Sequence, residues 1–162
     1  MILSKSSADK KLRRMALEIA ERNADAPGLI IIGIKENGMV IAKKISAYLA
    51  EVFKGSIKTI SLSINKKEPG EVTLSEETNI AGKVILLTDD VANSGRTMLY
   101  ALRPLLDQYP AKIETLALVE RTHKHFPVAL NYVGLSVATS AEEHIVVTTQ
   151  DGEITGAEIV SK

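Results

Sequence analysis

Short aliphatic runs alternate along this chain with segments of helical periodicity, and this alternation constrains the fold more than any other feature. Residues 29–32, 84–87 and 112–119 have the length and apolar character of buried strands. Before and between these runs, apolar residues recur at helical spacing in residues 9–23, 39–53 and 98–109. The last of these segments contains Pro104, where a helix can bend or restart. The pattern predicts an α/β fold with a mainly parallel central sheet and helices on both faces.

The remaining segments predict a short hairpin at the C-terminus and one weakly patterned loop. Residues 56–64 and 133–137 are further expected strands, and residues 144–149 and 153–160 flank an Asp151-Gly152 turn that is typical of a β-hairpin. Residues 66–81 are mostly polar and are expected to form a mobile loop or a short hairpin. Because no repeat or linker interrupts the pattern, residues 1–162 are expected to form a single domain.

Composition limits the classes of function. The absence of cysteine excludes disulfides, thiol nucleophiles and zinc–thiolate sites. No apolar run is long enough to span a membrane and the N-terminus lacks the order of a secretory signal, so we expect no membrane partner and a cytoplasmic location. Lys plus Arg equals Asp plus Glu at 20 each, so any RNA binding would need a local basic patch.

Residues 83–97 combine the features of a sugar-phosphate site. An aliphatic strand leads into Asp89 and Asp90, and the turn Asn93-Ser94-Gly95 then opens a helix. Loop N–H groups and the positive end of the helix dipole can hold a phosphate, while the carboxylates can accept hydrogen bonds from sugar hydroxyls or help to bind a metal ion. The alternative is an ordinary strand–turn–helix in which these polar residues only cap and turn the chain.

Two further segments follow expected strands, where parallel α/β sheets bind ligands. Lys35, Glu36 and Asn37 lie between Gly33 and Gly38 and form a plausible anion-binding loop; the alternative is a glycine-rich turn into the next helix.

Residues 120–127 contain one arginine and two histidines. Arg121 and His123, with His125, can bind a base that carries carbonyl groups, or carry protons near neutral pH. The alternative is a solvated basic loop.

Residues 83–97, with Ser-Gly-Arg-Thr at positions 94–97, resemble the phosphoribosyl-pyrophosphate (PRPP) motif of type I phosphoribosyltransferases. Residues 33–38 are similar to the pyrophosphate loop of that family, often Gly-Ile-Lys-Thr-Arg-Gly in its nearest relatives. Residues 119–134 look like a stretch of the PyrR group, pyrimidine operon attenuators that also act as uracil phosphoribosyltransferases. The resemblance spans nearly the whole chain and implies the type I phosphoribosyltransferase fold.

The resemblance also implies a reaction and a set of site residues. A phosphoribosyltransferase moves phosphoribose from PRPP to uracil or a related base and releases pyrophosphate. Asp89 and Asp90 would be the catalytic residues, contacting the ribose hydroxyls and holding Mg²⁺ indirectly through PRPP and water. The other implied substrate-binding residues are Lys35, Glu36, Asn37, Gly38, Val91, Ala92, Asn93, Ser94, Gly95, Arg96, Thr97, Arg121 and His123.

A second function remains open: a weakly catalytic or non-catalytic regulator that senses PRPP or a nucleotide and binds RNA. Its candidate phosphate contacts are the cations of the first helix, Lys10, Lys11, Arg13, Arg14 and Arg22, which would otherwise form a solvated helix face. The resemblance further implies a homo-oligomer, expected to be a dimer.

Three positions depart from the family pattern. Thr88 stands where an aliphatic residue usually precedes the acidic pair, and Glu36-Asn37 replaces Thr-Arg in the pyrophosphate loop. Residues 61–81 are shorter than the flexible loop of the PyrR group, with Asn65-Lys66-Lys67 in place of Tyr-Arg-Asp. Since such loops complete a site and exclude water, we expect PRPP binding to be better preserved than catalysis.

Overall fold

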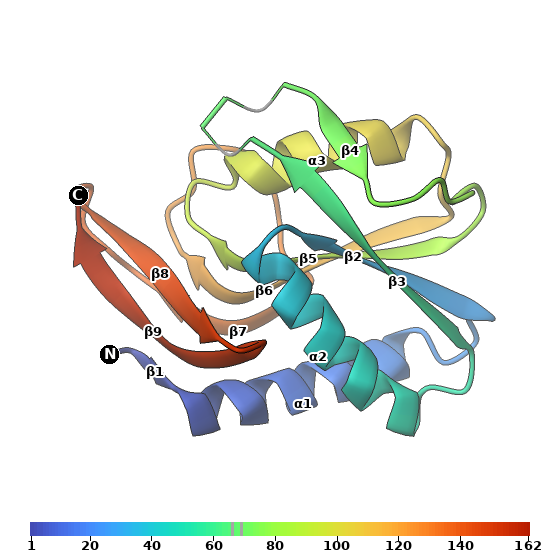
Figure 1. The fold of residues 1–162 in the computed structure, drawn as a ribbon, viewed down its shortest axis with the longest axis horizontal. Helices are drawn as coiled ribbons and strands as arrows, with labels where there is room; N and C mark the ends of the chain where they lie inside the picture. The colour runs from blue at the N-terminus through green and yellow to red at the C-terminus, as the bar shows by residue number, and fades with distance from the viewer. Residues whose placement is uncertain (66, 69) are drawn as a thin grey trace.

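The structure, a computed structural model, describes residues 1–65, 67–68 and 70–162. These residues form two sheets, with strand orders β4-β3-β2-β5-β6-β7 and β1-β9-β8 (Figure 1). Within the same residues the helices are α1 (Lys5–Arg22), α2 (Asn37–Val52) and α3 (Arg96–Leu106). The strands are β1 (Leu3–Ser4), β2 (Gly28–Ile34), β3 (Ser56–Ile64), β4 (Val72–Leu74), β5 (Val84–Ala92), β6 (Lys112–Arg121), β7 (Tyr132–Val137), β8 (Glu143–Gln150) and β9 (Glu153–Ser161).

The main sheet is parallel except at one edge, as the alternating pattern predicts. Strands β3, β2, β5, β6 and β7 pair in parallel, and β4 pairs antiparallel with β3. Helices α1 and α2 lie together on one face and α3 lies on the other (Figure 1), so the apolar side chains form two core clusters, one on each side of the sheet. No helix in the described part of the chain combines the length and apolar character needed to cross a bilayer.

Local sequence explains where the first helix begins and which face it buries. The Ser4 hydroxyl caps α1 by accepting the N–H of Ser7 at 3.2 Å. Leu12, Met15 and Ile19 recur at helical spacing and are buried against the sheet.

Several elements differ from the expected boundaries. Strand β5 continues to Ala92, so the acidic pair lies within the last residues of the strand and not after its end. Strand β6 likewise continues to Arg121, which was expected in a loop. Helix α3 runs through Pro104 as one element.

The polar segment after β3 contains a hairpin, since β4 pairs with the end of β3. This pairing confirms one of the two expectations for that segment. Lys66 and Pro69 lie outside the described residues.

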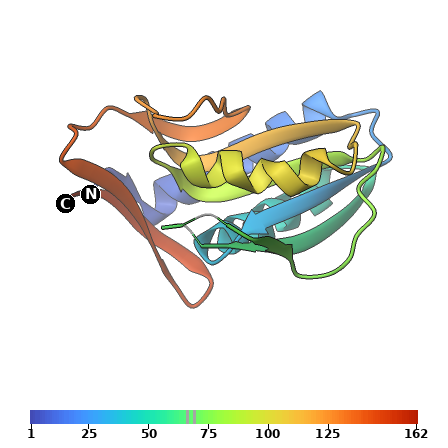
Figure 2. The ribbon, with the colours of Figure 1, turned by 90° about the horizontal axis from the view of Figure 1, so that it is seen from above.

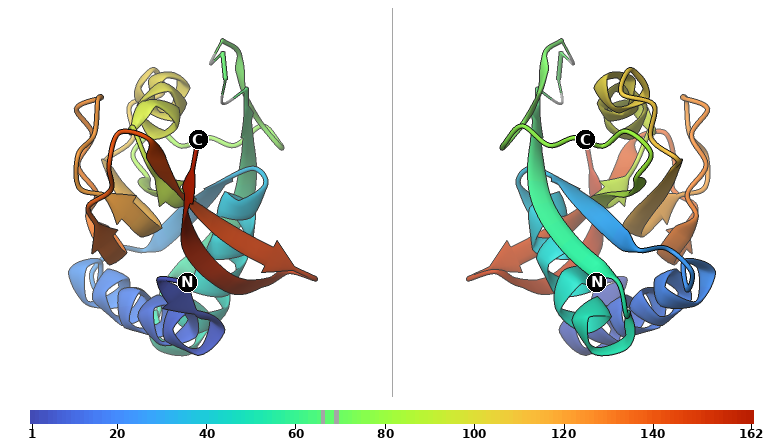
Figure 3. Two further views of the ribbon diagram at one scale, coloured as in Figure 1. Left: turned by 90° about the vertical axis from the view of Figure 1, so that its left-hand side faces the viewer. Right: turned by 90° about the vertical axis from the view of Figure 1, so that its right-hand side faces the viewer.

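The C-terminal hairpin is confirmed and is larger than expected. Asp151 and Gly152 form its turn with φ angles of 52° and 75°. The short strand β1 adds to β9, so the small sheet joins both ends of the chain. Strand β8 contacts β5, β6 and α2, which places the hairpin beside the carboxyl ends of the parallel strands (Figures 2 and 3).

Candidate functional site

A cavity of about 260 Å³ opens at the carboxyl end of the main sheet, between the loop that joins β5 to α3 and the inner side of β8. This is where ligands bind in parallel α/β sheets. Its lining residues are Asn37, Asp89, Asp90, Val91, Ala92, Asn93, Ser94, Gly95, Arg96, Thr97, Met98, Ile145, Val146 and Val147. All nine residues predicted between positions 89 and 97 are therefore brought together on one surface.

The acidic pair is buried and oriented by its neighbours. Asp89 is 2% exposed and Asp90 is 8% exposed. Asp90 Oδ1 accepts the N–H of Val91 at 2.8 Å, and Asp90 Oδ2 accepts Asn37 Nδ2 at 3.0 Å. Asp89 Oδ1 accepts the N–H of Asp90 at 2.9 Å. These bonds fix two carboxylates at the cavity wall before any ligand arrives, as binding of sugar hydroxyls requires.

The loop after β5 has the conformation expected of an anion-binding turn. Gly95 has a φ of 84°, and a Cβ there would lie 2.7 Å from Val128 Cγ1, so any other residue would be strained at this position. Ser94 Oγ accepts the N–H of Arg96 at 3.2 Å, but the N-cap position of α3 is Gly95, so Ser94 stabilises the turn before the helix. The Ser94 carbonyl accepts the N–H groups of His125 and Phe126, and these bonds attach the loop to the segment that follows β6.

The opposite wall comes from β8, which sequence reasoning did not assign to the site. Ile145, Val146 and Val147 line the cavity from this strand, and Met98 adds a side chain from α3. The sequence indicates a strand at 144–149 but carries no signal that it faces residues fifty positions away, because that contact is purely tertiary.

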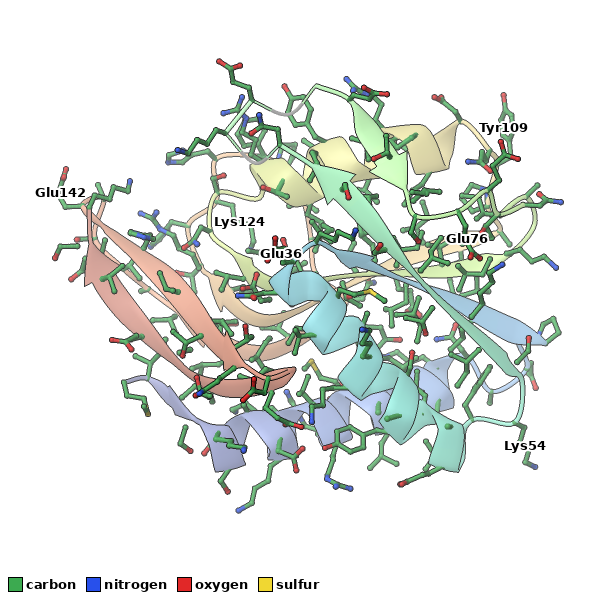
Figure 4. All side chains as sticks on the ribbon, in the orientation of Figure 1. Glu36, Lys54, Glu76, Tyr109, Lys124 and Glu142 are labelled. Carbon is green, nitrogen blue, oxygen red and sulfur yellow. The ribbon has the colours of Figure 1, made fainter. Side chains whose placement is uncertain are left out.

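The loop after β2 contributes less than predicted. Of its four predicted site residues, Asn37 lines the cavity, whereas Lys35 and Glu36 are exposed and do not line it. Figure 4 labels Glu36 at the start of α2. Gly38 is buried against β5, where a Cβ would lie 2.9 Å from the carbonyl oxygen of Thr88. Gly38 therefore allows a close approach between the two loops rather than lining the cavity.

Thr88 has a defined structural role that explains one departure from the family pattern. The residue is fully buried, and its hydroxyl lies 3.1 Å from the carbonyl of Gly38 and 3.2 Å from that of Ile32. It therefore bonds the strand that carries the acidic pair to the start of α2.

Arg121 and His123 do not line this cavity. Arg121 is 9% exposed and donates Nη2 to the carbonyl of Ser140 at 3.0 Å, while its buried Nε has no hydrogen-bond partner among the described residues. His123 is exposed. Their predicted role beside the base stays a prediction.

The cations of α1 are largely engaged within the protein. Arg14 donates to the carbonyl of Val133 at 2.8 Å, and Arg22 donates to that of Asn131 at 3.1 Å. Arg13 pairs with Asp9 at 3.1 Å and lies over the ring of Tyr48 at 4.3 Å.

Lys10 and Lys11 complete this group; Lys10 is exposed and Lys11 is half-buried. Three of the five candidate RNA contacts thus also serve the fold.

The cavity fits the indirect metal binding implied by the resemblance. The described residues hold no cluster of three side chains able to bind a metal by themselves. Mg²⁺ is commonly held by one or two carboxylates, with substrate phosphates and water as its other ligands. Asp89 and Asp90 supply such a pair.

Comparison with known proteins agrees with this geometry. Residues 1–151 match the family model described as "Phosphoribosyl transferase domain". A protein named "Bifunctional protein PyrR" from Haemophilus ducreyi is 31% identical to this chain, over 93% of this chain and 89% of its own length. A protein of the same name from Roseiflexus sp. is 32% identical, over 98% of this chain and 93% of its own length.

Solved structures share the fold. The hypoxanthine phosphoribosyltransferase of Trypanosoma cruzi superposes with a TM-score of 0.79 at 13% identity, covering 96% of this chain and 94% of that one. A hypoxanthine-guanine phosphoribosyltransferase from Bacillus anthracis superposes with a TM-score of 0.71 at 21% identity, covering 90% and 85%. With its acidic strand end, its loop and a family model that spans most of its length, this chain belongs to the type I phosphoribosyltransferase family.

Proposed function

We propose that this protein transfers phosphoribose from PRPP to uracil or a related base and releases pyrophosphate. The observation that carries the proposal is the cavity in which two buried carboxylates, Asp89 and Asp90, face the loop from Asn93 to Thr97. That arrangement offers oxygen acceptors for a sugar and N–H donors for a phosphate within one space. The choice of uracil rests on the resemblance to the PyrR group and on the relatives that carry this name.

In this proposal the protein acts mainly by positioning. The loop after β5 holds the 5′-phosphate with backbone N–H groups and the hydroxyls of Ser94 and Thr97. Asp89 and Asp90 hold the ribose hydroxyls and lie close to the positive charge that develops on the anomeric carbon as its bond to pyrophosphate breaks. A bound Mg²⁺ would stabilise the negative charge of the departing pyrophosphate.

The exposed positions of Lys35 and Glu36 support weak activity. In the open cavity, only Asn37 of this loop is in place to meet pyrophosphate. Fewer contacts to the leaving group leave more of its charge to water, which lowers the rate of transfer more than it lowers PRPP binding.

Two measurements test the proposal. Calorimetry with PRPP and Mg²⁺ is expected to show binding, and incubation with radiolabelled PRPP and a panel of bases is expected to yield a nucleotide with uracil. Absence of heat in the first measurement, while a known phosphoribosyltransferase binds under the same conditions, would reject the proposal. A nucleotide formed only with a purine would reject uracil as the base, but it would still support the proposed transfer of phosphoribose.

A regulator that binds RNA is the second candidate, favoured by the "Bifunctional" name of the relatives. Binding to a pyrimidine-operon leader RNA should weaken steeply as salt rises. Arg13→Ala together with Arg14→Ala should weaken it further if the α1 face is used. Because both arginines also make intramolecular bonds, Lys10→Ala with Lys11→Ala is the cleaner variant.

The proposal includes a cytoplasmic homodimer. Light scattering coupled to size exclusion measures the oligomeric state directly, and a monomer at the concentrations used for the PRPP assay would remove the dimer from the proposal.

A further inference from the structure

Strand β8 leaves one of its edges open to the main sheet. Among the residues that the structure describes, the strand pairs with β9 on one side only, at the end of the sheet β1-β9-β8. An edge strand has a row of N–H and C=O groups that a neighbouring strand would normally bond. Ile145 and Val147 are two residues apart and present such groups toward the carboxyl end of the main sheet.

Two asparagine side chains occupy this edge in place of a strand. Asn93 donates Nδ2 to the carbonyl of Ile145 at 3.1 Å and accepts the N–H of Ile145 on Oδ1 at 3.0 Å. Asn37 donates Nδ2 to the carbonyl of Val147 at 3.1 Å. The hairpin is therefore joined to the loop after β5 and to the start of α2 by side-chain amides.

Asn37 differs from Asn93 because it also touches the acidic pair. Its Nδ2 donates to Asp90 Oδ2 at 3.0 Å, and its Oδ1 accepts the hydroxyl of Thr149 at 3.0 Å. A single amide group thus connects a carboxylate of the cavity with two residues of β8.

Helix α2 carries a second attachment to the hairpin. Lys44 Nζ lies 2.5 Å from Glu153 Oε2, seven residues and two helical turns after Asn37. Asn37 and Lys44 therefore lie on the same side of α2, and this side faces the hairpin along the first half of the helix.

We propose that Asn37 is a positioning residue that couples Asp90 to β8, so that a ligand bound to Asp90 also steadies the hairpin wall of the cavity. A hydroxyl that donates to Asp90 restrains the carboxylate, the carboxylate restrains the Asn37 amide, and the amide restrains Val147 and Thr149. Local opening of the hairpin then becomes less frequent. The ligand part of this inference rests on the proposed PRPP binding, whereas the attachment of β8 does not.

Thr149 provides the test of the coupling. Its side chain does not line the cavity, and its hydroxyl bonds to Asn37 among the described residues. Thr149→Val should raise the Kd for PRPP with Mg²⁺ about three- to tenfold, the effect of one lost hydrogen bond. Thr149→Ser keeps the donor and should restore the wild-type Kd. Thr155→Val is the matched control, because that hydroxyl bonds Thr148 within the hairpin.

A double-mutant cycle separates coupling from an unrelated loss of packing. In the Asn37→Ala background, Thr149→Val should have no further effect on the Kd. An unchanged Kd in Thr149→Val, or an equal effect in both backgrounds, would overturn the coupling.

Hydrogen exchange of the ligand-free protein tests the attachment without PRPP. Asn37→Ala should speed exchange of the amides in residues 145–149, and Thr155→Val should not. If the wild type binds no PRPP, the proposed function fails and this measurement alone decides the attachment. If exchange in β8 is unchanged by Asn37→Ala, the attachment itself is wrong.

Discussion

Two buried acidic sites of the same sheet differ in what surrounds them. At the carboxyl end, Asp89 and Asp90 border an open cavity. Near the amino end of β6, Glu114 is 7% exposed and its carboxylate is surrounded by protein groups. The Tyr132 hydroxyl lies 2.9 Å from both of its oxygens, and Asn23 Nδ2 lies 2.7 Å from Oε1.

The difference separates a binding site from a structural one. A buried carboxylate that is fully bonded by its own protein joins elements, here the end of α1, β6 and the start of β7. A buried pair that lines an open cavity can be reached by a ligand. We therefore expect changes at the two sites to affect different measurements.

The largest expected effect is on PRPP binding. Asp89→Ala with Asp90→Ala should weaken binding of PRPP with Mg²⁺ by at least about a hundredfold, since charge-assisted hydrogen bonds to the ribose are lost. Calorimetry measures the change, and Asp107→Ala at the end of α3 is the control carboxylate. Retained affinity in the double variant would contradict the assignment of the cavity.

The loop beside the acidic pair gives the next largest effect, on stability. Gly95→Ala combines a positive φ with a clash at 2.7 Å and should lower the free energy of unfolding by about 2–4 kcal/mol. Gly152→Ala has a similar φ of 75° with nothing within 4 Å of the added Cβ, and should lower it by about 1 kcal/mol.

Denaturant unfolding of both variants measures the difference. Equal losses would show that packing of the loop against Val128 contributes nothing.

At the enclosed site the expected effect is on stability alone. Tyr132→Phe removes the hydroxyl from Glu114 and should lower the free energy of unfolding by about 1–2 kcal/mol while leaving the Kd for PRPP unchanged. A changed Kd for PRPP in Tyr132→Phe would show that the enclosed Glu114 site also affects binding at the cavity.

The same residue gives a pH dependence. Burial, and then the hydrogen bond and charge of Glu114, raise the pKa of Tyr132 above its ordinary value of 10.0. The folded state therefore holds this proton more tightly, so the stabilisation is complete below pH 10 and is lost as the pH rises toward the raised pKa. Denaturant unfolding measured up to about pH 11 should show this loss in the wild type and a flatter profile in Tyr132→Phe.

The smallest effect is expected at the exposed loop after β2. Glu36→Gln removes a negative charge next to Asn37, which lines the cavity, and should lower the Kd for PRPP by about twofold at low salt and not at high salt. Glu142→Gln, at the far end of the hairpin in Figure 4, is the control. A tenfold gain would show that Glu36 comes much closer to the ligand than its exposed position indicates.

Much of the site could be predicted because its signal is local. The residues from Asp89 to Thr97 follow one strand and enter one helix, so their order along the chain already places them on one surface. Predictions were less complete where contacts come from distant segments. Arg121 was expected in a loop beside the base, but β6 extends to include it and its guanidinium bonds Ser140.

Local sequence patterns predict the parallel α/β fold, the C-terminal hairpin and the acidic strand end, because hydrophobic periodicity and turn chemistry act over a few residues. Tertiary structure alone decided which wall closes the cavity and which side chains reach it. Asn37 became a link between Asp90 and Val147, although its neighbours Lys35 and Glu36 stay exposed. Such contacts depend on how a hairpin near the C-terminus packs on two distant loops, and no short-range pattern encodes that packing.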